Sequence, residues 1–292
     1  MSQLAFLFPG QGSQYVGMGK VFYENFKVAR EVFEEAADSI EIDVKTLCFE
    51  GPEESLKLTE NTQPTILTVS VAIQRAFYSE TGLLPKMGAG HSLGEYSALV
   101  AADGLDFSDA VRVVKLRGKY MQEAVPPGVG GMVAVLGGDK KTVEDACISA
   151  SNGEVVSPAN FNAPGQIVIS GHLSAIERAL EILKEKEITK VVPLPVSAPF
   201  HSSLMKEAAQ KLERELEKIR FRDLKFPIVT NVEAKIVHDA EHTRSSLVSQ
   251  MSSPVKWDDS IEVMIEEGIQ EMLELGPGKV LTGLMKRINK NI

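Results

Sequence analysis

The chain has 292 residues, of which 43% are hydrophobic and 24% charged, a composition typical of a globular protein with a large core. Its formal net charge of −9 argues against binding to nucleic acid or to an anionic membrane, because both need clustered lysines and arginines. The two cysteines, Cys48 and Cys147, lack a CxxC spacing, so we expect neither a structural metal nor a disulfide framework.

The chain begins with an apolar run, Leu4 to Phe8, that has no basic segment before it. This pattern indicates a short buried strand and not a signal peptide. A glycine loop, residues 9–14, follows, as expected where a buried strand delivers a loop to a sheet edge. No window approaches the roughly 20 apolar residues of a membrane span, so we expect a cytoplasmic protein.

Helices are expected over residues 20–38 and 62–80, where apolar positions recur at spacings of three and four. Residues 87–91 then form a brief strand of small residues. A glycine turn leads from it into a helix-forming run over residues 95–102. Strand, tight turn and helix therefore follow one another directly.

Residues 130–197 show two successive βαβ patterns, the order of a split ferredoxin-like arrangement. Proline and glycine clusters bound this stretch, at residues 126–131 and at Pro199. We therefore expect residues 129–197 to form a small inserted domain, and residues 1–128 and 198–292 to form the core. The expected strands are 132–136, 155–161, 166–170 and 190–196, and the expected helices are 140–151 and 173–186.

After the insert, strands and helices continue to alternate. The expected helices are 202–219, 244–251, 260–267 and a short terminal one, and the expected strands are 227–231 and 271–275. Alternation of this kind predicts an α/β core with a mostly parallel sheet.

Gly90-His-Ser-Leu-Gly94 matches the pattern GxSxG. Glycines on both sides of the serine let the backbone turn sharply from strand to helix and leave the hydroxyl exposed. The alternative is a glycine turn with a serine that caps the helix. The strand before and the helix after it favour Ser92 as a nucleophile.

A serine hydroxyl is a weak nucleophile at neutral pH, so we expect a histidine base within hydrogen-bond reach. His91 is the serine's neighbour and should point away from its hydroxyl, His172 lies in the insert, and His238 and His242 lie in a polar loop. His201 follows an apolar strand at its carboxyl end, where α/β sites form. It is therefore the candidate base, although a histidine near a helix start would look the same.

No acidic residue is an obvious third member of a triad. Asp258 and Asp259 are candidates, and a main-chain or amide carbonyl could hold the imidazole instead. Main-chain amides of the loop at residues 10–13, and that of Leu93 directly after the serine, could stabilise an oxyanion.

Arg117 falls on the apolar stripe of a helix expected over residues 109–125. A buried guanidinium needs an anionic partner, and a substrate carboxylate would serve. A structural ion pair or a side chain that reaches back to solvent is the alternative.

Further short motifs are spread over the whole chain. They are Phe8-Pro-Gly-Gln-Gly-Ser-Gln14, Thr62-Gln-Pro64, Gly90-His-Ser-Leu-Gly-Glu-Tyr-Ser97, Lys115-Leu-Arg-Gly118, Asn160-Phe-Asn-Ala-Pro-Gly-Gln166, Val196-Ser-Ala-Pro-Phe-His-Ser202, Thr230-Asn231, Gln250 before Ser253-Pro-Val-Lys-Trp257, and Glu274-Leu-Gly-Pro-Gly278. In this order they resemble the malonyl-CoA:acyl carrier protein transacylases of type II fatty acid synthesis and the related acyltransferases of polyketide synthases.

The resemblance implies a hydrolase-like α/β core with a ferredoxin-like insert. It also implies ping-pong transfer of a malonyl group from malonyl-CoA to the phosphopantetheine thiol of acyl carrier protein, through an ester on Ser92. His201 would be the base, held by the carbonyl of Gln250. The main-chain amides of Gln11 and Leu93 would bind the oxyanion.

By the same resemblance, Arg117 would bind the malonyl carboxylate, and Asn162 and Asn231 match positions near the cleft. Phe200 looks like the bulky residue of malonyl-preferring members, where it leaves little room for a 2-methyl group. One such methyl group changes the binding free energy in a pocket by only about 1–3 kcal/mol.

We expect no metal or redox cofactor and a monomeric protein. Because carrier proteins are acidic, the basic residues Lys286, Arg287 and Lys290 are candidates for docking. Three other functions stay open: a free-standing acyltransferase that loads a polyketide or nonribosomal assembly line, a serine hydrolase such as a thioesterase, and a non-catalytic module that binds carrier proteins. An intact pair of Ser92 and His201 argues against the last.

Overall fold

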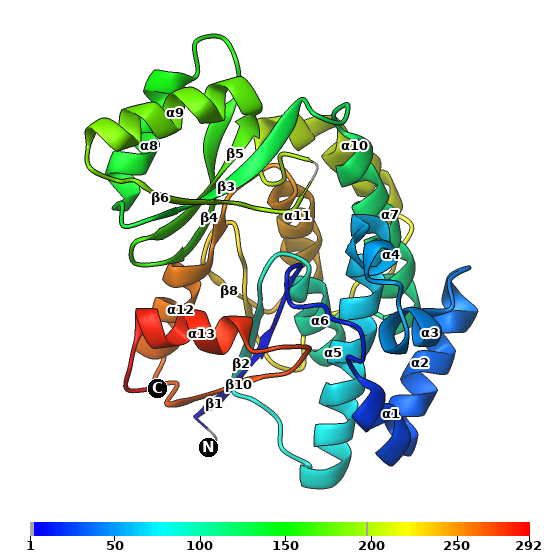
Figure 1. Ribbon diagram of the computed structural model, residues 1–292. Coiled ribbons are helices and arrows are strands. Elements are labelled where there is room, and N and C mark those ends of the chain that lie inside the picture. The colour runs from blue at the N-terminus through cyan, green and yellow to red at the C-terminus, as the bar shows by residue number, and fades with distance from the viewer. Residues whose placement is uncertain (1–2, 197) are drawn as a thin grey trace.

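The computed structural model describes residues 3–196 and 198–292 (Figure 1). Its first sheet has the strand order β10-β1-β2-β7-β8. Parallel pairing joins β10 to β1, β1 to β2 and β2 to β7, whereas β8 is antiparallel to β7. These strands are β1 (Leu4–Phe8), β2 (Met87–Gly90), β7 (Ile228–Val229), β8 (Ile236–Val237) and β10 (Glu271–Glu274). The predicted α/β fold with a mostly parallel core sheet is confirmed.

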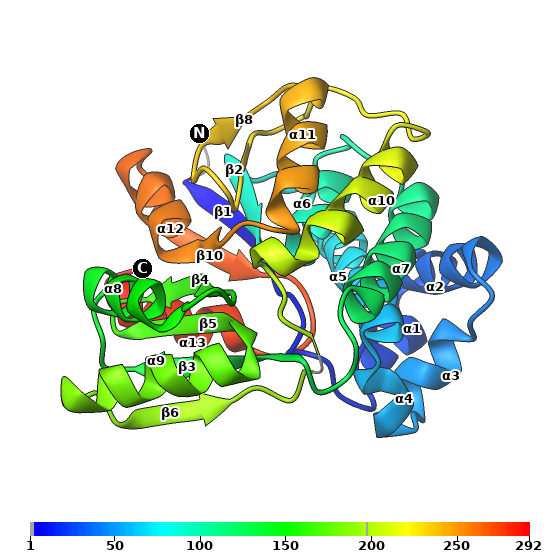
Figure 2. The ribbon, with the colours of Figure 1, turned by 90° about the horizontal axis from the view of Figure 1, so that it is seen from above.

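Side chains of β1 alternate between two hydrophobic layers. Phe6 and Phe8 pack on one face of the sheet with helices α2, α5, α6 and α7, while Ala5 and Leu7 pack on the other with α12 and α13. Figure 2 shows α2, α5 and α7 on one side of β1 and β2, and α12 on the other. A strand buried on both faces explains the unbroken apolar run in the sequence.

The core helices are α1 (Lys20–Asn25), α2 (Lys27–Ser39), α3 (Val44–Phe49), α4 (Glu53–Lys57), α5 (Thr59–Thr81), α6 (Gly94–Ala101), α7 (Phe107–Glu123), the 3₁₀ turn η1 (Ser203–Met205), α10 (Lys206–Leu216), α11 (Ala240–Gln250), α12 (Trp257–Glu266) and α13 (Val280–Ile288). Two of the predicted helices are not continuous in the structure, and the ends of others differ by up to four residues. The helix predicted over residues 20–38 is broken at Phe26, which has an extended backbone. The ring of Phe26 stacks on that of Phe22, with the ring centroids 5.9 Å apart. The helix predicted over 202–219 starts with η1 and is regular only over α10.

The second sheet has the order β6-β3-β5-β4-β9. Its first four strands are antiparallel neighbours in the ferredoxin-like order, and β9 pairs with β4 in parallel. They are β3 (Gly130–Leu136), β4 (Val156–Ala163), β5 (Gln166–His172), β6 (Lys190–Pro193) and β9 (Val255–Lys256), with α8 (Lys140–Ala150) and α9 (Leu173–Glu185) packed against them. The domain boundaries at 128/129 and 197/198 stay a prediction, and residue 197 lies outside the described residues.

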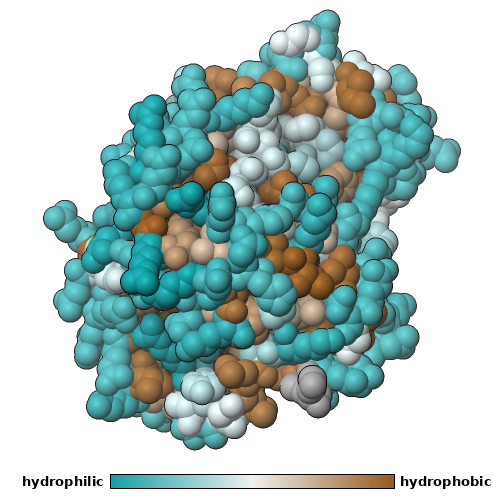
Figure 3. Space-filling model, turned by 180° about the vertical axis from the view of Figure 1, so that it is seen from behind, coloured by the Kyte–Doolittle hydropathy of each residue, from teal (hydrophilic) through white to brown (hydrophobic). Residues whose placement is uncertain are grey.

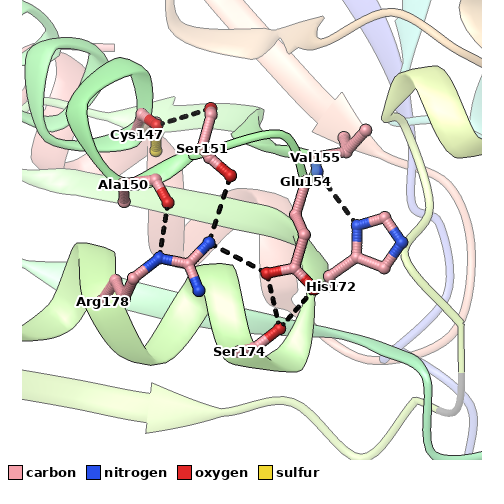
Figure 4. Close-up of polar contacts among 8 residues, drawn as sticks. All are labelled: Cys147, Ala150, Ser151, Glu154, Val155, His172, Ser174 and Arg178. Carbon is pink, nitrogen blue, oxygen red and sulfur yellow. Dashed lines mark hydrogen bonds and ion pairs between the residues drawn. The ribbon is translucent and has the colours of Figure 1, made fainter.

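Arg178 of α9 caps the carboxyl end of α8 (Figure 4). Its Nε donates to the carbonyl of Ala150 at 2.8 Å, and its Nη2 donates to the carbonyl of Ser151 at 3.1 Å and to Glu154 at 2.9 Å. The Ser174 hydroxyl donates to the same carboxylate. A cation on the last carbonyls of a helix satisfies groups that the helix leaves unpaired, so this network ties α8 to α9.

The surface opposite to the view of Figure 1 is mostly hydrophilic, with small hydrophobic patches between polar side chains (Figure 3). Within residues 3–196 and 198–292, the structure has no helix with the length and apolar character needed to cross a membrane.

Candidate active site

Ser92 lies in the sharp turn between β2 and α6, with its backbone in the left-handed region at φ 51°. Both flanking positions require glycine, because neighbouring backbone atoms leave no room for a Cβ. A Cβ on Gly90 would lie 1.9 Å from the carbonyl of Gly94, and a Cβ on Gly94 would lie 2.0 Å from the carbonyl oxygen of Phe8. The GxSxG pattern is therefore a packing requirement of this turn, and the turn leaves the Ser92 hydroxyl facing a cavity.

The structure brings Ser92 and His201 together although they are 109 positions apart, with Oγ 2.8 Å from Nε2. The other ring nitrogen, Nδ1, lies 2.8 Å from the main-chain carbonyl oxygen of Gln250. Because a carbonyl can only accept, the proton is on Nδ1, and Nε2 is left to accept from the serine hydroxyl. Burial, aided by the positive charge of Arg117, lowers the pKa of His201 to about 3, so its imidazole is the neutral, basic form.

The third position of a triad is occupied by a carbonyl and not by an acid. Asp258 and Asp259, the acidic candidates, both form ion pairs with Lys140, at 3.1 and 2.5 Å. Of the two alternatives that the sequence left open, an aspartate or a carbonyl, the structure has the main-chain carbonyl of Gln250.

Arg117 is buried, with only 1% of its surface exposed. Its Nη1 donates to Oε1 of Gln63 at 2.9 Å, and its Nη2 donates to Oε1 of Gln250 at 2.9 Å and to Oγ of Ser92 at 3.0 Å. All three acceptors are neutral, and Nε has no partner in the described part of the chain. A buried guanidinium with only neutral acceptors is suited to receive an anion beside the serine.

Gln63 is a site residue that our reasoning from the sequence did not single out. It lies in the motif Thr62-Gln-Pro64 and is 1% exposed in α5. It lies near the start of this long helix, and its burial, which the sequence alone does not show, is what requires a polar partner.

The two amides expected to bind an oxyanion belong to residues that line the same cavity as Ser92. Within the described residues, neither the Gln11 nor the Leu93 main-chain N–H donates a hydrogen bond. The loop of Gln11 approaches closely because residue 10 is a glycine, whose added Cβ would lie 2.3 Å from the carbonyl oxygen of His91. Two unpaired donors next to a serine hydroxyl can stabilise negative charge on a bound carbonyl oxygen.

A cavity of about 90 Å³ lies in front of Ser92. Core and insert both contribute to its wall, because Met132 lies on β3 and Leu194 and Val196 follow β6. Phe200, which is 6% exposed, completes the apolar side. A cavity of this size has room for several water molecules or a short acyl group.

Asn231 and Asn162 support the serine turn and are not among the residues that line the cavity. The side chain of Asn231 accepts from the Ser92 N–H at 2.7 Å and donates to the Gly90 carbonyl at 2.7 Å. Asn162 Oδ1 lies 2.8 Å from Nε2 of His91. Both asparagines thus contact the turn that carries Ser92, and a direct role for them in substrate binding stays a prediction. Asn160, which we did not predict, lines the cavity instead.

Two other histidines have different partners. Nδ1 of His172 accepts from the Val155 N–H at 2.9 Å inside the insert (Figure 4). His242 lies 2.6 Å from the carboxylate of Glu233 at the surface. In the part of the chain that the structure describes, His201 is the histidine that contacts the Ser92 hydroxyl.

Comparison with known proteins agrees with this geometry. Residues 5–291 match the family described as the acyl transferase domain. The malonyl CoA-acyl carrier protein transacylase of Escherichia coli K12 is 50% identical over 288 residues, which are 99% of this chain and 93% of that protein. Its counterpart in Bacillus subtilis 168 is 46% identical over 293 residues, covering 100% and 92%.

Solved structures give the same result. An acyl carrier protein S-malonyltransferase from Vibrio cholerae superposes with a TM-score of 0.97 at 45% identity, covering 100% of this chain and 95% of that one. A malonyl-transacylase in complex with a type II PKS acyl-carrier protein superposes with a TM-score of 0.97 at 48% identity, covering 99% and 94%. Fold and site therefore define an acyltransferase. Within that class, the chain belongs to the malonyl CoA-acyl carrier protein transacylase family.

Proposed function

We propose that the protein transfers a malonyl group from malonyl-CoA to the phosphopantetheine thiol of an acyl carrier protein in fatty acid biosynthesis. One observation carries this proposal: the buried cation of Arg117 lies 3.0 Å from the hydroxyl that His201 can deprotonate. An acyl group whose far end is a carboxylate can bind the guanidinium and the serine at once. An uncharged acyl group leaves the guanidinium without its anion.

In the first half of the reaction, Nε2 of His201 takes the proton of the Ser92 hydroxyl as Oγ attacks the thioester carbonyl. The amides of Gln11 and Leu93 stabilise the alkoxide that forms. The carbon–sulfur bond then breaks, the imidazolium returns its proton to the leaving thiolate of coenzyme A, and the malonyl ester of Ser92 remains.

The second half reverses these steps. His201 takes the proton of the carrier's phosphopantetheine thiol, and the thiolate attacks the Ser92 ester. The ester bond breaks, and the proton passes from His201 to the serine oxygen. Throughout, Arg117 holds the malonyl carboxylate, so the acyl group stays in one place while the thiols exchange.

The sharpest test is mass spectrometry of the protein mixed in turn with malonyl-CoA, acetyl-CoA and methylmalonyl-CoA. We expect one malonyl group on the peptide that contains Ser92, its loss when phosphopantetheinylated carrier protein is added, and no labelling of Ser92→Ala. His201→Ala should slow acylation by several orders of magnitude. Acylation of Ser92→Ala, or near-normal rates in His201→Ala, would contradict the assigned roles.

The choice of carrier is the finer part of the proposal. One solved relative is a complex with a type II PKS acyl-carrier protein, so a role in loading polyketide or nonribosomal carriers is the second candidate. A panel of fatty acid and polyketide carriers tests it, and faster transfer to a polyketide carrier would overturn the fatty acid assignment. Rapid release of free malonate with carrier present would instead indicate a thioesterase.

We place this reaction in the cytoplasm and without a metal or redox cofactor, since the side chains above supply each proton transfer. Both cysteines are buried and free, as suits a reducing compartment. The exposed side chains of Lys286, Arg287 and Lys290 are proposed to contact the acidic carrier protein.

A further inference from the structure

Gln250 serves two catalytic groups at once. Its main-chain carbonyl accepts from Nδ1 of His201 at 2.8 Å, and its side-chain Oε1 accepts from Nη2 of Arg117 at 2.9 Å. The first contact depends on the position of the backbone at the end of α11, but the second depends on which way the carboxamide is turned. Arginine only donates, so a carboxamide turned by half a rotation would present its NH₂ group to another donor and lose the contact.

The opposite end of this carboxamide meets a buried carboxylate, that of Glu95. Nε2 of Gln250 donates to Oε2 of Glu95 at 2.9 Å, and the main-chain N–H of Asn231 donates to the same oxygen at 3.0 Å. Nε2 also donates to the Ser92 carbonyl at 3.0 Å and to Oδ1 of Asn231 at 3.3 Å. The carboxamide is thus held between a cation on its oxygen side and acceptors on its nitrogen side, of which Glu95 is the shortest contact and the one carboxyl group. This arrangement admits one orientation of the amide.

Glu95 is placed to act on the site and not merely on the fold. It lies in the first turn of α6, three positions after Ser92, and none of its surface is exposed. Burial raises its pKa to about 7, against the opposing effect of its hydrogen bonds. A carboxyl group in such a place costs stability that an apolar side chain of similar size would not, so a contribution to the site is the better explanation.

We propose that Glu95 is a positioning residue for acyl transfer: it holds the Gln250 carboxamide in the orientation that keeps the Arg117 guanidinium aimed at the acyl carboxylate. The inference rests on the proposed function. Glu95 touches neither substrate nor the reacting atoms, so its effect passes through Gln250 to Arg117. The property it controls is the preference for malonyl over acetyl groups.

Two neutral substitutions separate the hydrogen bond from the charge and the packing. Glu95→Gln keeps an acceptor oxygen for Gln250, whereas Glu95→Met has a similar length and volume but no acceptor. Ser97→Ala is the matched control, because Ser97 is buried in the same helix and its hydroxyl has no partner among the described residues. Each variant is measured for kcat/KM with malonyl-CoA and with acetyl-CoA, and for its melting temperature.

We expect the malonyl-to-acetyl ratio of Glu95→Met to fall by roughly 10- to 100-fold, since small displacements of a binding group cost up to about that much. Glu95→Gln and Ser97→Ala should keep the ratio within about threefold of the wild type, a difference below ~1 kcal/mol. If Glu95 had only a structural role, kcat/KM would fall equally for both substrates, together with the melting temperature. An unchanged ratio in Glu95→Met, or an equal fall in Glu95→Gln, would overturn the inference.

Should Glu95→Met fail to fold, Glu95→Asp takes its place, because it keeps the carboxylate but withdraws it by one methylene. The same selective loss of malonyl transfer is then expected, and an unchanged ratio would overturn the inference. The wild-type protein reports on the proposed function separately. If the wild type transfers malonyl and acetyl groups equally well, both the proposed function and the role of Glu95 are overturned. If the wild type prefers malonyl and these variants keep that preference, only the role of Glu95 is overturned.

Discussion

The imidazole of His201 is held by the main-chain carbonyl of Gln250, through a hydrogen bond of 2.8 Å from Nδ1. The carbonyl sets the tautomer as an aspartate would, but it brings no negative charge. The positive charge of Arg117 instead disfavours the imidazolium and so lowers the pKa of His201. His201 is therefore a base that stays neutral until it takes the serine proton.

This electrostatic setting predicts how acylation depends on pH. Because the pKa of His201 is lowered to about 3, His201 stays unprotonated as the pH falls through the range where an ordinary histidine gains its proton. The rate constant for labelling Ser92 with a neutral sulfonyl fluoride should be constant between about pH 8 and pH 5. Circular dichroism over the same range controls for unfolding. Glu95 titrates near 7 in the same site, so the profile is also measured with Glu95→Gln, and an inflection near the ordinary histidine pKa of about 6.5 that persists in this variant would contradict the prediction.

Arg117→Ala should remove the preference for malonyl over acetyl groups. The guanidinium is buried, so losing its contact with a carboxylate should cost about 2–5 kcal/mol of transition-state binding. The loss should appear in kcat/KM for malonyl-CoA and not for acetyl-CoA. Equal losses with both substrates would show that the guanidinium supports the serine turn and does not bind the carboxylate.

Gly94→Ala should destabilise the protein and abolish labelling of Ser92. The added Cβ would lie 2.0 Å from the carbonyl oxygen of Phe8, so the turn must shift, at a cost of at least about 1–3 kcal/mol in the free energy of unfolding. Gly283→Ala in α13 is the control, because its Cβ would meet no atom within 4 Å. Helix propensity then favours alanine by roughly 0.4–1 kcal/mol. Urea denaturation of both variants measures the difference, and similar stabilities would refute the packing argument.

Phe200→Ala should admit a 2-methyl group on the malonyl chain. Phe200 lines the small cavity on its apolar side, and one methyl group is worth about 1–3 kcal/mol in such a pocket. The ratio of kcat/KM for methylmalonyl-CoA to that for malonyl-CoA should therefore rise by about 10- to 200-fold. If both substrates change together, Phe200 does not form the wall that meets this methyl group.

Much of the fold was predictable, because each strand and helix is indicated by the pattern of residues within its own segment. Ser92 and Arg117 were also accessible from local pattern, one through its flanking glycines and the other through a cation on an apolar stripe. His201 followed from its place after a strand. The break at Phe26 was not predictable, since an extended residue between two helix-forming runs leaves the spacing of apolar residues almost unchanged.

The residues that the sequence did not reveal act through partners far along the chain. Gln63 meets Arg117 across 54 positions, and Gln250 meets Glu95 across 155. Such pairs exist only once the fold has formed. The contact to His201 is harder still, because a main-chain carbonyl belongs to every residue and leaves no mark in the sequence. Gln250 was suggested by family resemblance alone.

The short strand β9 belongs to the chain after the insert, yet it pairs with β4 and so closes the edge of the insert's sheet. Lys140 of α8 reinforces this junction through Asp258 and Asp259, which directly follow β9 and Trp257. A chimaera that exchanges only residues 129–197 with a relative would join a foreign sheet edge to a native β9. A chimaera designed to exchange acyl selectivity between such enzymes should therefore exchange residues 255–259 together with the insert.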